Sequence, residues 1–445
     1  MTTTLLTAMQ ELSRQLGDSW SSVTDGAGAA TSLVDSALMS KANDWVTDNS
    51  WAFLIEEPAS AAAIYDERKI SSLDNTTGTL TTLTFAAAPG TGIDYEVHRL
   101  FSPSDKRTAL VAAARRIYPH LFTEVWDETL VSGNWFKDGS FEKWTSSSAL
   151  SFWTAATVTL TQTTGAGYFR HGTTSCKLSG ASGTLIQRWI AGTANFDDLK
   201  ELRGKSVTFT LAAWCDTASS LRISIADGTD TTYSSYHAGN SAWTDVASPM
   251  KVSQAISSTA TGVTFTIHYT TGAIAYVDDA RAIGGLRTRL YIGHLGLSQN
   301  RPHQVAVETG SQQQLVTGNN TSIQNDRWVT ARDWLVDPDG YLHLPTSYPT
   351  NYRLRIRGIG YLDFLVSGAS STAWTATIAL DQPQLEILIA QAAMYLYTTM
   401  SLPNFETGTR KQFQEAMGFW AQELAERKAR YSMLTPAATV HWGVN

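Results

Sequence analysis

The sequence predicts an α+β multidomain protein in which an all-β jelly-roll sandwich is inserted into a discontinuous domain of helices and short strands. The length of 445 residues is enough for two or three domains with sizeable cores. Apolar residues at helical spacing lie toward the two ends of the chain, whereas the middle is rich in Ser, Thr and Gly and alternates with a period of two. We therefore expect a first part over 1–130, the sandwich over 131–285 and a second part over 286–445.

The first part contains two predicted helices and a small sheet. Apolar residues at spacings of four and three define one face of a helix that Gly17 ends: Leu5, Met9 and Leu12. Short β-favouring runs separated by turn residues follow from 51 to 100 and predict a small barrel or curved sheet. A second helix is expected to start near Ser102, a capping residue, and to place Leu110 on its buried face.

The middle of the chain alternates as half-buried antiparallel strands do. The clearest alternation runs over 206–211 and 221–225, and turn clusters separate such runs at the spacing of a jelly roll. This pattern also predicts that Trp214 is buried. The two cysteines, Cys176 and Cys215, fall at strand positions, where two buried thiols are favoured over a disulfide.

The last part resumes a β-rich pattern and then becomes helical. In the β-rich stretch, Arg353, Arg355 and Arg357 form a basic stripe, for which a solvated face or intersubunit ion pairs are favoured over phosphate binding. The segment 337–340 is expected to be a β-turn rather than a calcium loop, because the other ligands are missing. Two helices follow over 384–400 and 409–431, the second with an apolar face formed by Phe413, Met417 and Trp420. The non-periodic tail keeps an apolar Trp442 and is a candidate docking arm.

Composition and charge argue against several classes of partner. The 43% hydrophobic content is that of a globular protein. With 33 basic against 40 acidic residues, the net charge of −7 disfavours nucleic acid as the main partner. No apolar run is long enough to span a membrane, and the first residues lack the features of an export signal, so neither a membrane nor export is expected.

The sequence predicts that the protein is not an enzyme. It contains no Gly-x-Ser-x-Gly elbow and no His-Glu-x-x-His helix. The triplet 204–206 reads Gly-Lys-Ser, but a phosphate-binding loop also needs a glycine at position 199, which is Leu199. Adjacent acids such as Glu56 and Glu57 or Asp278 and Asp279 would point to opposite faces of a strand. Neither pair could therefore act together as general acid and general base.

Several segments of the middle part together resemble carbohydrate-binding modules of the jelly-roll type. The resemblance rests on 138–142 (Asp-Gly-Ser-Phe-Glu), 172–178, 207–214 and 276–279 (Tyr-Val-Asp-Asp). It implies a structural calcium ion held by Glu142 with Asp278 or Asp279; the alternative is that these acids cap strand ends and bind nothing. It also implies a glycan site, for which the aromatic residues beside turns are the candidates: Trp144, Tyr233 and Tyr236. No other cofactor is expected.

The two outer parts resemble, in organisation, the head-to-tail connector or adaptor proteins of the neck of tailed bacteriophages. The resemblance implies a virion protein at the capsid–tail junction, made in the host cytoplasm. It would form a homo-oligomeric ring that binds the portal and a tail or neck protein and lines the path of the packaged DNA without sequence specificity. The large sandwich departs from that pattern and would project outward. The expected interface residues are Leu5, Met9, Leu12, Leu110, Phe413, Met417, Trp420 and Trp442. The alternative is a tail, receptor-binding or decoration protein whose sandwich binds host or environmental polysaccharide.

Overall fold

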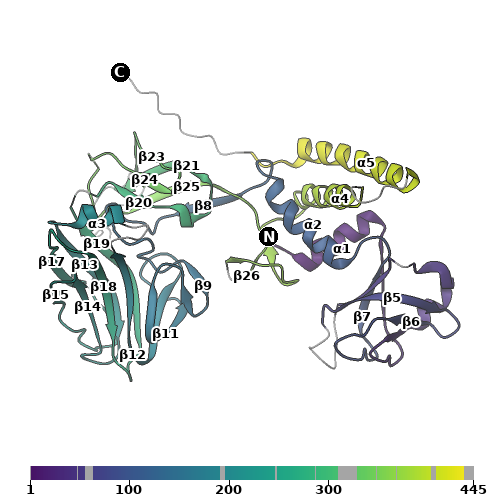
Figure 1. Ribbon diagram of the computed structural model, residues 1–445, viewed down its shortest axis with the longest axis horizontal. Coiled ribbons are helices and arrows are strands. Elements are labelled where there is room, and N and C mark those ends of the chain that lie inside the picture. Colours follow the sequence, from purple (N-terminus) through teal and green to yellow (C-terminus); the bar gives the residue numbers. More distant parts are fainter. Residues whose placement is uncertain are drawn as a thin grey trace, which may run out of the picture. The chain divides into compact units, whose positions relative to one another are not determined.

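The computed structural model divides the chain into two compact units (Figure 1). It describes residues 2–47, 49–55, 64–190, 196–245, 248–285, 287–308, 328–346, 348–366, 368–401 and 407–434. Unit 1 comprises Met1–Thr123 and Tyr361–Thr435, and the described residues of unit 2 lie within Glu124–Gly360. The boundaries therefore lie outside the expected 131 and 285, and the β-rich stretch 286–360 belongs with the sandwich rather than with the helices.

In the described residues, unit 1 contains four α-helices and small antiparallel sheets. The α-helices are α1 (Leu5–Leu16), α2 (Pro103–Arg116), α4 (Leu385–Ser401) and α5 (Thr407–Tyr431), and two 3-10 helices span Ser36–Ser40 and Asn43–Trp45. One sheet has the order β2 (Ser19–Val23), β7 (Asp94–His98), β4 (Trp51–Leu54), β5 (Glu67–Asp74), β6 (Thr79–Thr82) and β3 (Ser32–Val34). A second has the order β1 (Thr3–Thr4), β28 (Thr377–Ile378), β26 (Leu365–Val366) and β27 (Ala369–Ser370).

The helix ends follow the expected local chemistry. The Thr4 hydroxyl accepts a hydrogen bond from the Thr7 N–H at 3.1 Å and caps α1, and Gly17 ends that helix with a φ of 66°. In α2 the Ser102 hydroxyl accepts from the Asp105 N–H at 3.0 Å, and Pro103 occupies the first turn. No helix in the described residues is both long and apolar enough to cross a membrane.

The apolar faces of these helices pack against one another within unit 1, which corrects one expectation. Four residues expected at a subunit interface have no exposed surface in the single chain: Leu5, Met9, Leu12 and Leu110. Trp420 is 6% exposed and belongs to the same core. Phe413 and Met417 are half-buried on α5, and Trp442 lies outside the described residues. Helical spacing predicted burial correctly, but the partner that buries these faces is the chain itself.

Unit 2 contains the sandwich. Its hydrogen-bonded strands follow the order β15 (Thr231–Tyr233), β14 (Leu221–Ala226), β18 (Gly262–Tyr269), β12 (Ser175–Ile190), β19 (Ala275–Gly284), β13 (Ser206–Cys215) and β16 (Ala242–Trp243). Two further strands pair outside this order: β11 (Thr154–Thr163) with β12, and β17 (Met250–Ala255) with β13. The long β12 serves both layers, since its first half pairs with β19 and its second half with β18. Alternate residues of both layers form one core that includes Phe209, Val277, Ile223 and Phe265. This confirms the predicted jelly-roll sandwich. Cys176 and Cys215 are free thiols buried in that core.

Smaller elements complete unit 2. They are β9 (Trp144–Ser146) with β10 (Ala149–Leu150), helix α3 (Phe196–Leu202), the 3-10 turn Gly293–Leu295, a sheet of β20 (Arg289–Tyr291), β24 (Tyr341–His343) and β23 (Leu335–Val336), and a sheet of β22 (Trp328–Thr330), β21 (Leu297–Glu308), β25 (Leu354–Gly360) and β8 (Thr123–Asp127). The last two sheets share a second core with Leu130, Leu290 and Ile356. Leu130 also accepts the Leu354 N–H at 2.9 Å, which explains why 286–360 stay with this unit.

The basic stripe of the sequence has its partners inside the same chain. Arg355 donates to Glu128 Oε1 at 2.7 Å, and Arg357 lies 3.4 Å from the ring centre of Trp126. Arg353 pairs with Asp279 of the sandwich. Each arginine of the stripe therefore has a partner within the chain, and none of the three is fully exposed. The segment 337–340 is the expected turn, with the Gly340 N–H donating to the Asp337 carbonyl at 3.1 Å.

A buried ion pair ties α2 to the start of the sheet in unit 1. The Lys106 ammonium has no exposed surface and lies 2.7 Å from Asp18 Oδ2, 2.9 Å from Ser13 Oγ and 2.7 Å from His98 Nδ1. The Asp18 carboxylate also accepts the N–H groups of Arg99 and Phe101 at 2.9 and 3.1 Å. Burial lowers the pKa values of Lys106 and His98. The neutral His98 ring can therefore accept a hydrogen bond from the Lys106 ammonium through Nδ1.

We predict that Lys106→Met lowers the free energy of unfolding of unit 1 by about 3–5 kcal/mol, because it leaves the Asp18 carboxylate buried without a counter-charge. Chemical denaturation of the full chain, followed by the fluorescence of unit 1, measures the loss. Adding Asp18→Asn should recover part of it. Lys411→Met, which removes an exposed partner of Glu415, is the control and should change stability by less than about 0.5 kcal/mol. Equal losses for the two lysine variants would contradict the prediction.

Candidate functional site

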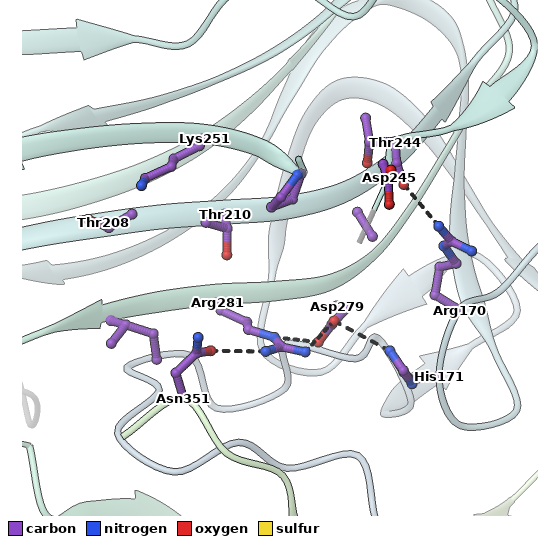
Figure 2. A pocket seen from close by; sticks show the side chains of 13 residues that line it. Arg170, His171, Thr208, Thr210, Thr244, Asp245, Lys251, Asp279, Arg281 and Asn351 are labelled. Atoms are coloured by element: carbon purple, nitrogen blue, oxygen red, sulfur yellow. Dashed lines mark hydrogen bonds and ion pairs between the residues drawn. The ribbon is translucent and has the colours of Figure 1, made fainter. Parts of the chain in front are cut away.

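The sandwich presents a polar hollow on the outer side of β13, β17 and β19 (Figure 2). Its volume is about 430 Å³, within the range of small-ligand sites. Its lining includes three cationic and three hydroxyl side chains: Arg170, Lys251, Arg281, Thr208, Thr210 and Thr244. Asp245, Asp279, His171 and Asn351 complete its polar lining. We call this hollow the arginine pocket.

Asp279 is the central charge of the arginine pocket. Arg281 donates to both of its oxygens, at 2.9 and 2.6 Å, and Arg353 approaches Oδ2 at 3.1 Å. Burial acts to raise the pKa of Asp279, but the two guanidinium groups outweigh it and lower that pKa to about 2. The carboxylate is therefore ionised and neutralised by its own arginines at any ordinary pH.

A β-bulge explains why Asp279 reaches this side. Thr210 lies opposite Arg281 and Ala212 lies opposite Asp278, so β19 holds one residue more than β13 over this stretch. Asp279 takes a φ of 48°, in the left-handed region. As a result both carboxylates reach the same loop, since Asp278 Oδ2 accepts the His171 N–H at 2.9 Å and Asp279 Oδ2 lies 3.6 Å from His171 Nε2. The expectation that these acids point to opposite faces was wrong at this bulge.

The loop at Arg170 and His171 forms one end of the arginine pocket. Figure 2 shows the Arg170 side chain turned toward Thr244, to whose carbonyl it donates at 2.9 Å. The same guanidinium lies 5.7 Å from the ring centre of Trp243. Burial, with Arg353 adding repulsion, lowers the pKa of His171 to about 4. His171 is therefore neutral at physiological pH and adds no charge to the pocket.

Aromatic rings gather on β13 and β19 next to the arginine pocket. Trp214 is half-buried and lies 5.2 Å from Tyr276, and Tyr168, 42% exposed, lies 4.5 Å from Tyr276. Trp214 was expected in the core, which is wrong. Its neighbours Ala213 and Cys215 have no exposed surface and take the inward positions, so the tryptophan points outward.

The other layer of the sandwich has an exposed aromatic site of its own. Tyr233 and Tyr236 are each 46% exposed, and the guanidinium carbon of Arg222 lies 4.1 and 4.7 Å from their ring centres. His268 lies 5.5 Å from the Tyr233 ring and 2.8 Å, through Nε2, from Ser224 Oγ. Burial, with Arg222 adding repulsion, lowers the pKa of His268. We call Arg222, Tyr233, Tyr236 and His268 the tyrosine face.

Strand register extends this face across the layer. Tyr233 pairs with Ser224, Ser224 with Thr266, Thr266 with Ile186 and Ile186 with Thr154. Residues directly opposite one another share a face, so the row crosses four strand spacings of about 4.8 Å each. Its middle is buried, whereas Thr154 and Ile186 line a hollow of about 220 Å³ at the far end. Ligand contacts are thus available at the two ends of the row.

The residues expected to hold calcium have other partners. Glu142 accepts the N–H groups of Thr173 and Thr174 at 2.7 and 3.0 Å, Asp278 accepts those of the loop at 170–171, and Asp279 pairs with arginines. Throughout the described residues, no group of three or more His, Cys, Asp or Glu side chains is placed to hold a metal ion. Within the chain, the three acids hold the loops at 170–174 and the arginines beside β19.

The predicted glycan candidates separate into two kinds. Tyr233 and Tyr236 lie together on the tyrosine face, as described. Trp144 is half-buried instead, packs against the sandwich core and donates from Nε1 to the Phe141 carbonyl at 2.7 Å. Sequence reasoning missed the arginine pocket, because its residues come from five separate segments and no local pattern joins them. Arg222 could have been found, since it occupies a polar position in the alternation of 221–225.

Comparison with known proteins gives a limited result. No protein-family model matches the chain, and no curated protein matches it. Among solved structures, the enzymatically active domain of tailspike protein 4 from bacteriophage CBA120 is 13% identical, over 34% of this chain and 21% of that chain, with a TM-score of 0.26. The module TmCBM61, solved with β-1,4-galactotriose, is 13% identical over 34% of this chain and 97% of its own, with a TM-score of 0.25.

A third structure is the CBM22-1 xylan-binding domain of Xyn10C from Paenibacillus barcinonensis. It is 14% identical over 37% of this chain and 97% of its own, with a TM-score of 0.25. At such identities and TM-scores we take no function from the similarity. None of these three structures is a connector protein, so the resemblance of the outer parts to neck proteins gains no support from them.

The low pKa of His171 gives a testable pH dependence. The unfolded chain takes up a proton on this histidine as the pH falls through 6.5, whereas the folded chain does so only near 4. Between those values stability therefore decreases with falling pH. We predict that unit 2 loses on the order of 2 kcal/mol through this group between pH 7 and 4.5, and that His171→Gln removes that part of the loss.

Denaturation of the wild-type chain and the variant at both pH values measures this difference. Thr208→Val changes the same pocket but removes no titratable group, so the stability of this variant should depend on pH as that of the wild type does. A His171→Gln chain whose stability falls as steeply as that of the wild type would refute the prediction.

Proposed function

We propose that the sandwich of unit 2 binds a polysaccharide through the tyrosine face. The observation that supports this most directly is the pair Tyr233 and Tyr236, each 46% exposed on the outer side of a sheet and held together by Arg222. Exposed aromatic rings offer an apolar surface to the C–H groups of a sugar ring. In the virion setting expected from the sequence, the chain would then be a tail, receptor-binding or decoration protein.

The polar groups of the tyrosine face suit sugar hydroxyls. The Arg222 guanidinium carries several N–H donors, and its contacts with both tyrosine rings limit the orientations it can take. His268 is neutral because burial lowers its pKa, and since Nε2 is paired with Ser224 Oγ, only the other ring nitrogen is left to act as donor or acceptor. Because these groups are already fixed by contacts within the chain, binding loses less side-chain entropy.

The proposal is one of binding without catalysis. Glycoside hydrolysis needs one carboxylic acid that donates a proton and a second carboxylate nearby. In the arginine pocket Asp279 has a pKa of about 2 and is held by two arginines, so it is a poor proton donor. The residues that define the tyrosine face include no carboxylate.

We predict that Tyr233→Ala and Tyr236→Ala each weaken glycan binding roughly tenfold, equivalent to about 1.4 kcal/mol, because each removes one ring from the platform. A glycan array with the full chain identifies a ligand, and calorimetry measures the affinities. Tyr361→Ala is the matched control, since Tyr361 is 43% exposed and belongs to unit 1. The affinity of the Tyr361→Ala chain for the same glycan should equal that of the wild type. Absence of any glycan ligand, or a ligand that binds both tyrosine variants normally, would refute the proposal.

A further inference from the structure

We propose that the arginine pocket is a second saccharide site, which takes an acidic sugar with its carboxylate bound by Lys251 and with Arg170 as a donor at the other end of the pocket. The pocket lies on the outer side of β13, β17 and β19, whereas the tyrosine face belongs to β14, β15 and β18. The sandwich core separates these two layers. A ligand in the pocket is therefore distinct from one on the tyrosine face.

The charge of the arginine pocket favours an anion. Three cationic side chains line it against two carboxylates, and one of those, Asp279, is already shared by Arg281 and the buried Arg353. Among the described residues, no hydrogen bond or ion pair engages the Lys251 ammonium, which is exposed at the pocket. Lys251 is therefore free to pair with a ligand, and Arg170 keeps further N–H donors beyond its bond to Thr244.

The uncharged lining favours a sugar over a bare inorganic anion. The hydroxyls of Thr208, Thr210 and Thr244 and the amide of Asn351 line the same hollow, and they match the hydroxyl groups of a sugar. Trp243, against which Arg170 stacks, lies beside the pocket and can contact an apolar ring face. Figure 2 shows Thr210 and the pair Arg281 and Asn351 on opposite sides of the hollow. The volume of about 430 Å³ suits one or two sugar units rather than a single small ion.

The test uses the full chain with trigalacturonate and, as the uncharged comparison, galactotriose, both measured by calorimetry at low and at physiological salt. We expect trigalacturonate to bind and to bind more weakly as salt screens its charge. Lys251→Gln should weaken this binding about tenfold, while Lys251→Arg retains most of it. Lys205→Gln, at an exposed lysine elsewhere in the same unit, is the matched control and should leave it unchanged.

The two proposed sites can be tested independently, because each variant should affect only its own site. Tyr233→Ala should not alter trigalacturonate binding, and Lys251→Gln should not alter binding of a ligand that needs the tyrosine face. Equal affinity for galactotriose and trigalacturonate would overturn the assignment of an acidic ligand. Competition by inorganic phosphate as strong as that by trigalacturonate would reduce the site to a general anion site and overturn the assignment of a sugar. Unchanged trigalacturonate binding by Lys251→Gln would also overturn it.

Discussion

The carboxylate of Asp279 is the contact on which one side of unit 2 depends. It joins Arg281 of the sandwich to Arg353, which immediately precedes β25 of the smaller sheet. Arg281 donates hydrogen bonds to both oxygens of this carboxylate, which fixes the orientation of that guanidinium, whereas Arg353 is held by charge attraction at 3.1 Å. Arg281 also donates to Asn351 at 2.9 Å, so this pairing sets both the junction of the two sheets and one wall of the arginine pocket.

Unit 1 also contains a paired carboxylate, and this one is more deeply buried. Asp18 and Lys106 have 1% and 0% of their side chains exposed, and together they connect the end of α1, the end of β7 and the start of α2. Buried pairs of this kind contribute little net stability over an apolar pair, because both charges lose their water. Their hydrogen bonds instead require one particular arrangement of the segments around them. In each unit, then, a paired carboxylate selects the arrangement while the apolar core supplies the stability.

The sequence patterns predicted where helices and strands lie better than they predicted what packs against each of their faces. Helical spacing found the faces of Leu5, Met9 and Leu12, and alternation found the strands of the sandwich, because burial repeats with the period of the element. Periodicity cannot tell whether a face is buried by its own chain or by a partner, so the expected interface turned out to be core. It also cannot tell which side of an alternating strand is inside when both carry apolar residues, which is why Trp214 was misplaced. Tyr233 and Tyr236 were identified because they lie beside turns.

The sequence could not predict the arginine pocket because a single extra residue in β19 creates it. Without the bulge, Asp278 and Asp279 would lie on opposite sides of the sheet, and the loop at 170–171 could not reach both. With it, one outer face of the sandwich becomes charged while the other carries rings around a single guanidinium. Charge attraction is screened by salt, whereas contact with aromatic rings depends mainly on apolar area. If both proposed sites bind, the two faces of one sandwich would recognise different parts of a polysaccharide by different physical means.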